Sequence, residues 1–99
     1  MARVQIIAAT KDPVPAESAT FTVSGPFWLF VDGMIPYEGN IIVERQDNAG
    51  TGYLNATDAS GPMFVGYAPN VAYFDLPAGT YRAPKPLTKF DVSLFYEEA

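Results

Sequence analysis

The chain has no cysteine and no histidine among its 99 residues. Disulfide frameworks are therefore excluded, as are zinc sites built on these residues and nucleophile systems of the Ser-His-Asp or Cys-His type. Paired carboxylates are the acid–base system that remains. The acidic residues between Asp32 and Asp47 fall around one expected hairpin, however, and are typical of solvated turn and edge charges. We expect no metal or other cofactor, and we expect that the protein is not an enzyme.

Basic residues and long apolar runs are also scarce. Six Lys and Arg stand against eleven Asp and Glu, and the resulting net charge of −5 disfavours binding to nucleic-acid phosphates. Every apolar run is far shorter than the ~20 residues that a membrane-spanning helix needs, and the first residues do not have the pattern of a secretory signal. We therefore expect neither a nucleic acid nor a membrane as a partner.

Helical periodicity is hard to find, whereas residues that form turns are plentiful. Nine prolines and eight glycines divide the chain into short segments rich in β-branched and aromatic residues, as in a β-sandwich or barrel. We predict a single all-β domain over residues 1–99, an antiparallel β-sandwich that includes the jelly roll among its forms, with about eight short strands. The expected strands cover residues 3–8, 19–24, 27–32, 41–46, 52–56, 71–75, 79–83 and 89–96. Prolines exclude residues 12–16 from a central strand, so an extended arm is expected around residues 10–17.

Alternation of apolar and polar residues predicts which face of a strand is buried. In residues 3–8 the pattern places Val4, Ile6 and Ala8 inside and Ile7 outside. In the last strand it places Phe90 on the buried face. Residues 27–31 are apolar on both faces, so one face needs cover from a loop, a terminus or another chain.

These apolar residues on outward faces, together with the proline-rich segment, suggest an oligomer interface. The candidate interface residues are Ile7, Val14, Phe27, Trp28, Ile42 and Phe95. We favour the core or an interface for Trp28. The alternative is a sugar-stacking platform formed by Trp28, Tyr37, Tyr53 and Tyr67.

Two segments carry a resemblance to a known group of proteins. The first is residues 39–45, GNIIVER, followed by the glycine-rich loop 47–52 and Tyr53, and the second is residues 76–82, LPAGTYR. Together they resemble the strand-and-turn units of small β-rich structural proteins of tailed bacteriophages, and they cover about a quarter of the chain. Tyr53 stands where the pattern leads us to expect Trp, and Pro84 and Pro86 interrupt the strand after Arg82.

The resemblance implies a non-enzymatic virion structural protein of the capsid decoration (cement) type. Such a protein would bind the major capsid protein or another virion protein on the capsid surface after synthesis in the host cytoplasm, and would act as a homo-oligomer, a trimer or a dimer. The alternatives are a small head–tail or tail accessory protein of a phage, and a carbohydrate-binding or adhesion module that uses exposed aromatic residues.

Overall fold

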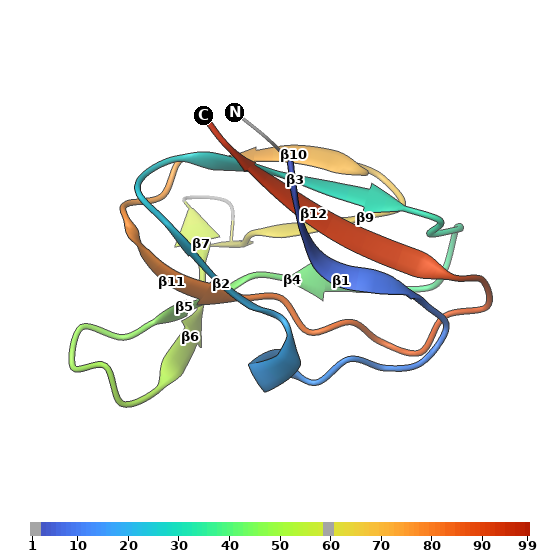
Figure 1. Cartoon of the computed structure of the whole chain (residues 1–99), viewed down its shortest axis with the longest axis horizontal. Helices are drawn as coiled ribbons and strands as arrows, with labels where there is room; N and C mark the ends of the chain where they lie inside the picture. The colour runs from blue at the N-terminus through green and yellow to red at the C-terminus, as the bar shows by residue number, and fades with distance from the viewer. Residues whose placement is uncertain (1–2, 59–60) are drawn as a thin grey trace.

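The computed structural model describes residues 3–58 and 61–99, which form twelve strand segments and one turn of 3-10 helix, Ala16–Ser18 (Figure 1). Two four-stranded sheets pack on each other, and every strand pairing is antiparallel. The first sheet contains, in order, β1 (Val4–Thr10), β12 (Val92–Glu98), β3 (Phe27–Asp32) and β10 (Val71–Phe74). The second sheet contains β2 (Thr20–Val23), β11 (Gly79–Arg82), β5 (Glu44–Gln46) and β6 (Tyr53–Asn55). Two small pairs complete the fold: β4 (Asn40–Ile42) with β9 (Phe64–Gly66), and β7 (Thr57–Asp58) with β8 (Gly61–Pro62).

The strand pairs are nested along the chain. The first strand pairs with the last, β2 pairs with β11, and β3 pairs with β10, while β5 and β6 form the innermost hairpin. Successive strands from β1 to β3, and again from β10 to β12, alternate between the two sheets. This arrangement is that of a jelly roll, a double sheet built from two Greek keys. The predicted antiparallel β-sandwich is therefore confirmed in its jelly-roll form.

An aromatic cluster fills the space between the two sheets. Phe27 stacks on Phe74 with ring centroids 5.4 Å apart, and Phe21 meets Phe27 edge to face at the same distance. Tyr81 lies beside them, 2% exposed, and its hydroxyl donates to the carbonyl oxygen of Pro77 at 2.7 Å. Each buried ring of this kind stabilises the fold by roughly 1.5–3 kcal/mol. The hydroxyl bond also holds the turn before β11 against the core.

The predicted buried face of β1 is wrong for a physical reason. Ile7 is only 3% exposed and belongs to the core, whereas Val4 is 43% exposed. The register with β12 shifts between Gln5 and Ile7, so that one additional residue of β1 is accommodated there. Such a bulge moves the following side chains to the opposite face of the sheet. Phe27 is likewise fully buried, so neither Ile7 nor Phe27 presents its side chain at the surface of this chain.

Three further boundaries differ from the sequence-based expectation. The last strand begins at Val92, which leaves Phe90 in the preceding loop with 52% of its surface exposed. The short segments β7, β8 and β9 occupy a stretch in which no strand was expected. Within the expected arm, Val14 exchanges two backbone hydrogen bonds with Lys85, at 2.9 and 3.0 Å. Among residues 3–58 and 61–99, there is no helix long and apolar enough to span a membrane.

Candidate interaction surfaces

The outer face of the second sheet is polar, and its side chains bond to one another. The hydroxyls of Thr22 and Thr80 lie 3.3 Å apart on neighbouring strands. Arg82 Nε donates to Glu44 Oε1 at 2.6 Å, and the guanidinium lies 3.9 Å from the ring centroid of Tyr53. This half of the sandwich therefore presents an ordinary solvated surface.

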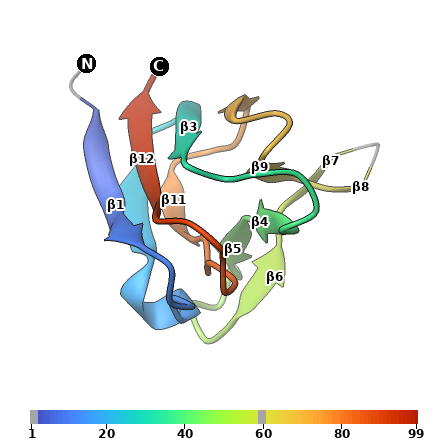
Figure 2. The ribbon, with the colours of Figure 1, turned by 90° about the vertical axis from the view of Figure 1, so that its right-hand side faces the viewer.

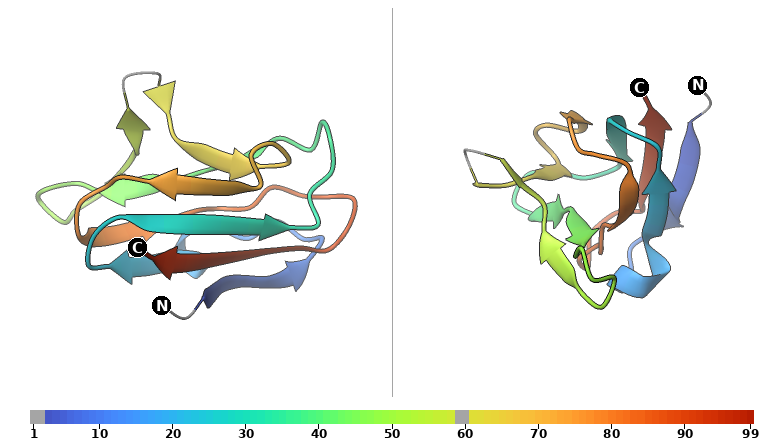
Figure 3. Two further views of the ribbon diagram at one scale, coloured as in Figure 1. Left: turned by 90° about the horizontal axis from the view of Figure 1, so that it is seen from above. Right: turned by 90° about the vertical axis from the view of Figure 1, so that its left-hand side faces the viewer.

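The outer face of the first sheet, which is turned toward the viewer in Figure 3 (left), is apolar by contrast. Side chains that alternate with the buried ones on β3, β10 and β12 point outward here, and we call them the aromatic face: Trp28, Phe30, Val71, Tyr73 and Phe95. Trp28, Val71 and Tyr73 are 38%, 42% and 45% exposed. The rings of Trp28 and Tyr73 pack with centroids 5.0 Å apart. An exposed apolar area of this kind is typical of interaction surfaces.

Charged groups border the aromatic face at both ends of its strands. The guanidinium of Arg3 lies 3.7 Å from the ring centroid of Phe30 and forms a 3.8 Å ion pair with Glu97. Asp32 lies at the other end, opposite Ser93 on β12, which is only 8% exposed. An apolar centre with a charged rim is the usual anatomy of a protein–protein interface.

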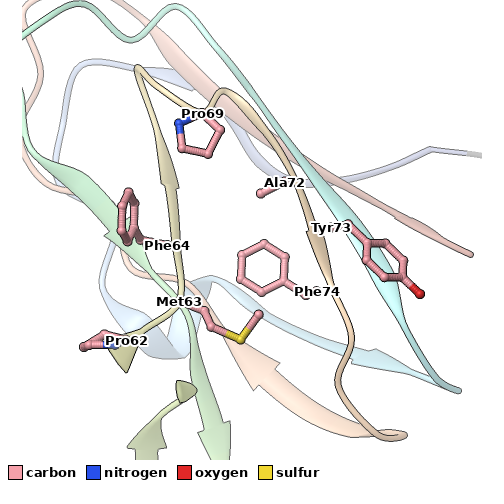
Figure 4. Close-up of a pocket in the computed structure, with 7 residues that line it drawn as sticks. All are labelled: Pro62, Met63, Phe64, Pro69, Ala72, Tyr73 and Phe74. Atoms are coloured by element: carbon pink, nitrogen blue, oxygen red, sulfur yellow. The ribbon is translucent and has the colours of Figure 1, made fainter. Parts of the chain in front are cut away.

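A shallow pocket opens beside β10, next to the aromatic face (Figure 4). Its volume is about 280 Å³. Phe74 lies at its centre with Met63 and Phe64 on the side of β9, while the Tyr73 ring points away (Figure 4). The remaining lining residues are Pro62, Pro69 and Ala72, so all of the lining side chains are uncharged. The pocket offers no acid–base group, and its chemistry is that of a site for an apolar side chain.

A second apolar surface lies at one end of the sandwich, where loops 11–15, 33–39 and 83–91 meet (Figure 2). We call it the loop end. Tyr37 is fully exposed there, and Leu87 and Phe90 are 69% and 52% exposed. Tyr37 has φ = +71°, a left-handed conformation that is unusual for a residue with a side chain. Bulky side chains held out in this way are typical anchors for a partner.

Buried polar groups fix the loops of this end to one another. The carboxylate of Glu38 accepts hydrogen bonds from the backbone N–H of Ile35, at 3.2 Å, and of Lys89. The ammonium of Lys85, in a residue only 3% exposed, donates to the carbonyl oxygens of Asp12 and Pro86 and to the hydroxyl of Thr88, at 3.0, 3.0 and 2.8 Å.

The close packing of the loop end also affects the pKa of Lys85 and requires glycine at position 33. Burial lowers the pKa of Lys85 below its usual 10.5, while the carboxylates of Glu38, Asp12 and Asp91 oppose that shift. Gly33 has φ = +98°, and a Cβ on it would lie 2.1 Å from the backbone oxygen of Asp91. Only glycine permits this approach. The three loops of the loop end are therefore held to one another and do not form independent loops.

The six predicted interface residues fall in different environments. Ile7 and Phe27 lie in the core, and Val14 is half-buried against it. Trp28 and Phe95 belong to the aromatic face. Ile42 is 39% exposed and pairs with Phe64 on the small β4–β9 sheet.

Sequence reasoning missed other surface residues. It did not connect Tyr73 with Trp28, and it placed Phe90 inside. The predicted sugar platform is not formed, because Trp28 and Tyr53 lie on opposite outer faces while Tyr37 and Tyr67 lie in turns.

In the part of the chain that the structure describes, no three His, Cys, Asp or Glu side chains are grouped so that they could hold a metal ion. Comparisons with protein-family models, with curated proteins and with solved structures found no match.

Proposed function

We propose that the chain is a non-enzymatic virion structural protein that binds the outer shell of a phage capsid and stabilises it as a decoration protein. The resemblance of residues 39–53 and 76–82 to small structural proteins of tailed phages supports this role. So does the chemistry of the exposed groups, which suits contacts with another protein. The partner in this proposal is the major capsid protein or another protein of the shell.

The observation that carries the proposal is the loop end. Tyr37, Leu87 and Phe90 are exposed at one end of the sandwich, and the bonds of Glu38 and Lys85 hold their loops in place. Because the hydrogen bonds hold the loops in place, docking orders little backbone, and its main conformational cost is the ordering of the exposed side chains. Loss of one such anchor typically weakens a complex by about 2 kcal/mol, or roughly thirtyfold.

The test is binding of the purified protein to phage particles that lack it. Tyr37→Gly is a sharp variant, because glycine accepts φ = +71° without strain, so the fold is kept while the anchor is removed. Leu87→Ser is a second variant, and Leu54→Ser is its matched control, since Leu54 is 51% exposed on β6. We expect wild type and Leu54→Ser to saturate the particles at a symmetric copy number, and Tyr37→Gly and Leu87→Ser to bind at least tenfold more weakly.

Two outcomes contradict the proposal. In the first, intact wild-type protein neither binds the depleted particles nor occurs in mature virions. In the second, the loop-end variants bind as well as the Leu54→Ser control. Retention of the wild type on polysaccharide columns, without binding to particles, would favour the carbohydrate-binding alternative instead.

A further inference from the structure

We infer that the aromatic face is the site at which a second copy of this chain packs, sheet against sheet, about a two-fold axis parallel to the strands. This inference rests on the proposed function in one respect, because it supplies the partner with which several loop ends act together. Its evidence is separate from the loop end and comes from the register, area and charge of the first sheet.

The area of the face suits a dimer of moderate affinity. Four strands spaced about 4.8 Å apart, each about six residues long, give a face of roughly 19 by 20 Å. A second sheet packed on it at about 10 Å would therefore cover roughly 380 Å² of each copy, about half of the ~800 Å² per partner of stable interfaces. The second sheet offers no equivalent surface, because its outward side chains are polar and already bonded to one another.

The outward side chains of the first sheet stand in rows across the strands. The ladder pairings and the Arg3–Glu97 ion pair give one row, in the order β1, β12, β3, β10, that contains Arg3, Glu97, Trp28 and Tyr73. The next row contains Gln5, Phe95, Phe30 and Val71. Ser93 and Asp32 form the last row. The first two rows are polar toward β1 and apolar toward β10, and these two rows are therefore complementary to their own reverse.

A two-fold axis parallel to the strands places each row of one copy against the same row of the second copy in reverse order. It exchanges β1 with β10 and β12 with β3, so Arg3 on β1 faces Tyr73 of the second copy. The Arg3 guanidinium, which stacks on Phe30 of its own chain, then lies between the two copies, where it can also contact an aromatic ring of the second copy. Glu97 lies over Trp28 of the second copy, whose indole N–H needs an acceptor once it is buried.

In the second row, Phe95 stands opposite Phe30 of the second copy and the Arg3 guanidinium that covers it. Ser93 is only 8% exposed, so the last row contributes Asp32 alone, near the axis. Because the axis follows the strands, the loop ends of both copies point the same way and can contact one surface together. Joining two weak contacts in this manner raises overall affinity by about 10²–10⁴.

Trp28 is the only tryptophan and lies within this face, so it reports on the contact without any substitution. We expect the mass by light scattering to rise from one chain to two between about 1 μM and about 1 mM, the range of moderate affinities. Over the same range the Trp28 emission should move to shorter wavelength, and its quenching by acrylamide should fall. Each chain carries a net charge of −5, so added salt should strengthen the association by screening repulsion.

Two arginine variants supply the matched comparison. Val71→Arg/Tyr73→Arg places two cations on the edge strand β10, opposite Gln5 and Arg3 of the second copy. Thr20→Arg/Thr22→Arg changes two alternate outward residues of the edge strand β2 on the polar face, with the same change in net charge. We expect the first variant to weaken dimerisation by at least about thirtyfold and the second to leave it unchanged.

The inference is overturned if wild type stays monomeric to about 1 mM with constant Trp28 quenching, or if it forms a trimer. It is also overturned if both arginine variants dimerise equally. The wild-type measurement keeps the test decisive if Val71→Arg/Tyr73→Arg does not fold. These measurements need no phage particle, so their failure is distinguishable from a failure of shell binding.

Discussion

Replacing Gly33 with alanine tests whether the loop end depends on the close approach of loops 33–39 and 83–91. The φ of +98° disfavours any residue with a Cβ, at a cost of about 1–2 kcal/mol. The new Cβ would also lie 2.1 Å from the backbone oxygen of Asp91, so the chain just before β12 must move. Backbone strain of this kind costs about 1–3 kcal/mol. We therefore expect Gly33→Ala to lower the free energy of unfolding by about 3 kcal/mol.

The measurement is urea unfolding followed by circular dichroism, together with the thermal transition. A loss of about 3 kcal/mol in a chain of this size corresponds to a fall in Tm of about 12–24 °C. Gly25→Ala is the matched control, because its Cβ would have no atom within 4 Å, and it should change stability by less than about 1 kcal/mol. If the free energy of unfolding of Gly33→Ala is within about 0.5 kcal/mol of the wild-type value, the contact with Asp91 does not hold these loops together. The reasoning for a rigid loop end would then fail.

Tyr81→Phe removes the hydroxyl that donates to Pro77 and should lower the free energy of unfolding by about 1 kcal/mol, or Tm by about 4–8 °C in calorimetry. Burial raises the pKa of Tyr81 above 10.0, with Arg45 opposing, so its contribution to stability is complete below pH 10 and is lost as pH rises through the folded-state pKa. The variant should lack that loss, and identical alkaline profiles would contradict this account. The hydroxyl and backbone N–H of Ser24 lower the pKa of Glu98 below 4.5, so its contribution is present above pH 4.5 and is lost as pH falls through the folded-state pKa. NMR titration of the Glu98 carboxyl should show the lowered pKa, and Glu98→Gln should flatten this part of the acid unfolding profile; an ordinary carboxyl titration would refute the bonds to Ser24.

The strands were predictable because their signals are local. Turn residues delimit residues 27–32 and 79–83, so the structure agrees there within one residue. The face of β1 was not predictable, because its bulge arises from pairing with β12, which lies some ninety positions later. Gly33 shows the same limit, because its positive φ goes with a close approach to the backbone of Asp91, far away in the sequence.

The candidate surfaces were predictable only in part. A run apolar on both faces, residues 27–31, indicated that one of its faces needs cover, and the structure places Trp28 and Phe30 on the outer side. Their neighbours Tyr73 and Phe95 come from β10 and β12, and single-chain periodicity does not tell which strands adjoin β3. The loop end was missed for a similar reason. Its bonds join backbone groups of loops that are far apart in sequence, and exposed Phe90 continues the alternation of the strand that follows it.

The two outer faces of the sandwich carry different exposed side chains, and the comparison indicates which of these side chains the fold itself requires. The second sheet closes the jelly roll with threonines, an Arg82–Glu44 ion pair and one aromatic ring, Tyr53, on its outside, and the Arg82 guanidinium covers that ring. On the first sheet, Trp28 and Tyr73 keep about two-fifths of their surface in water, and β10 is an edge strand. Exposed apolar side chains at a sheet edge promote unwanted association unless a partner covers them. Their presence on one face alone is therefore best explained by a contact that is absent from the isolated chain, and the register supplies a self-complementary one.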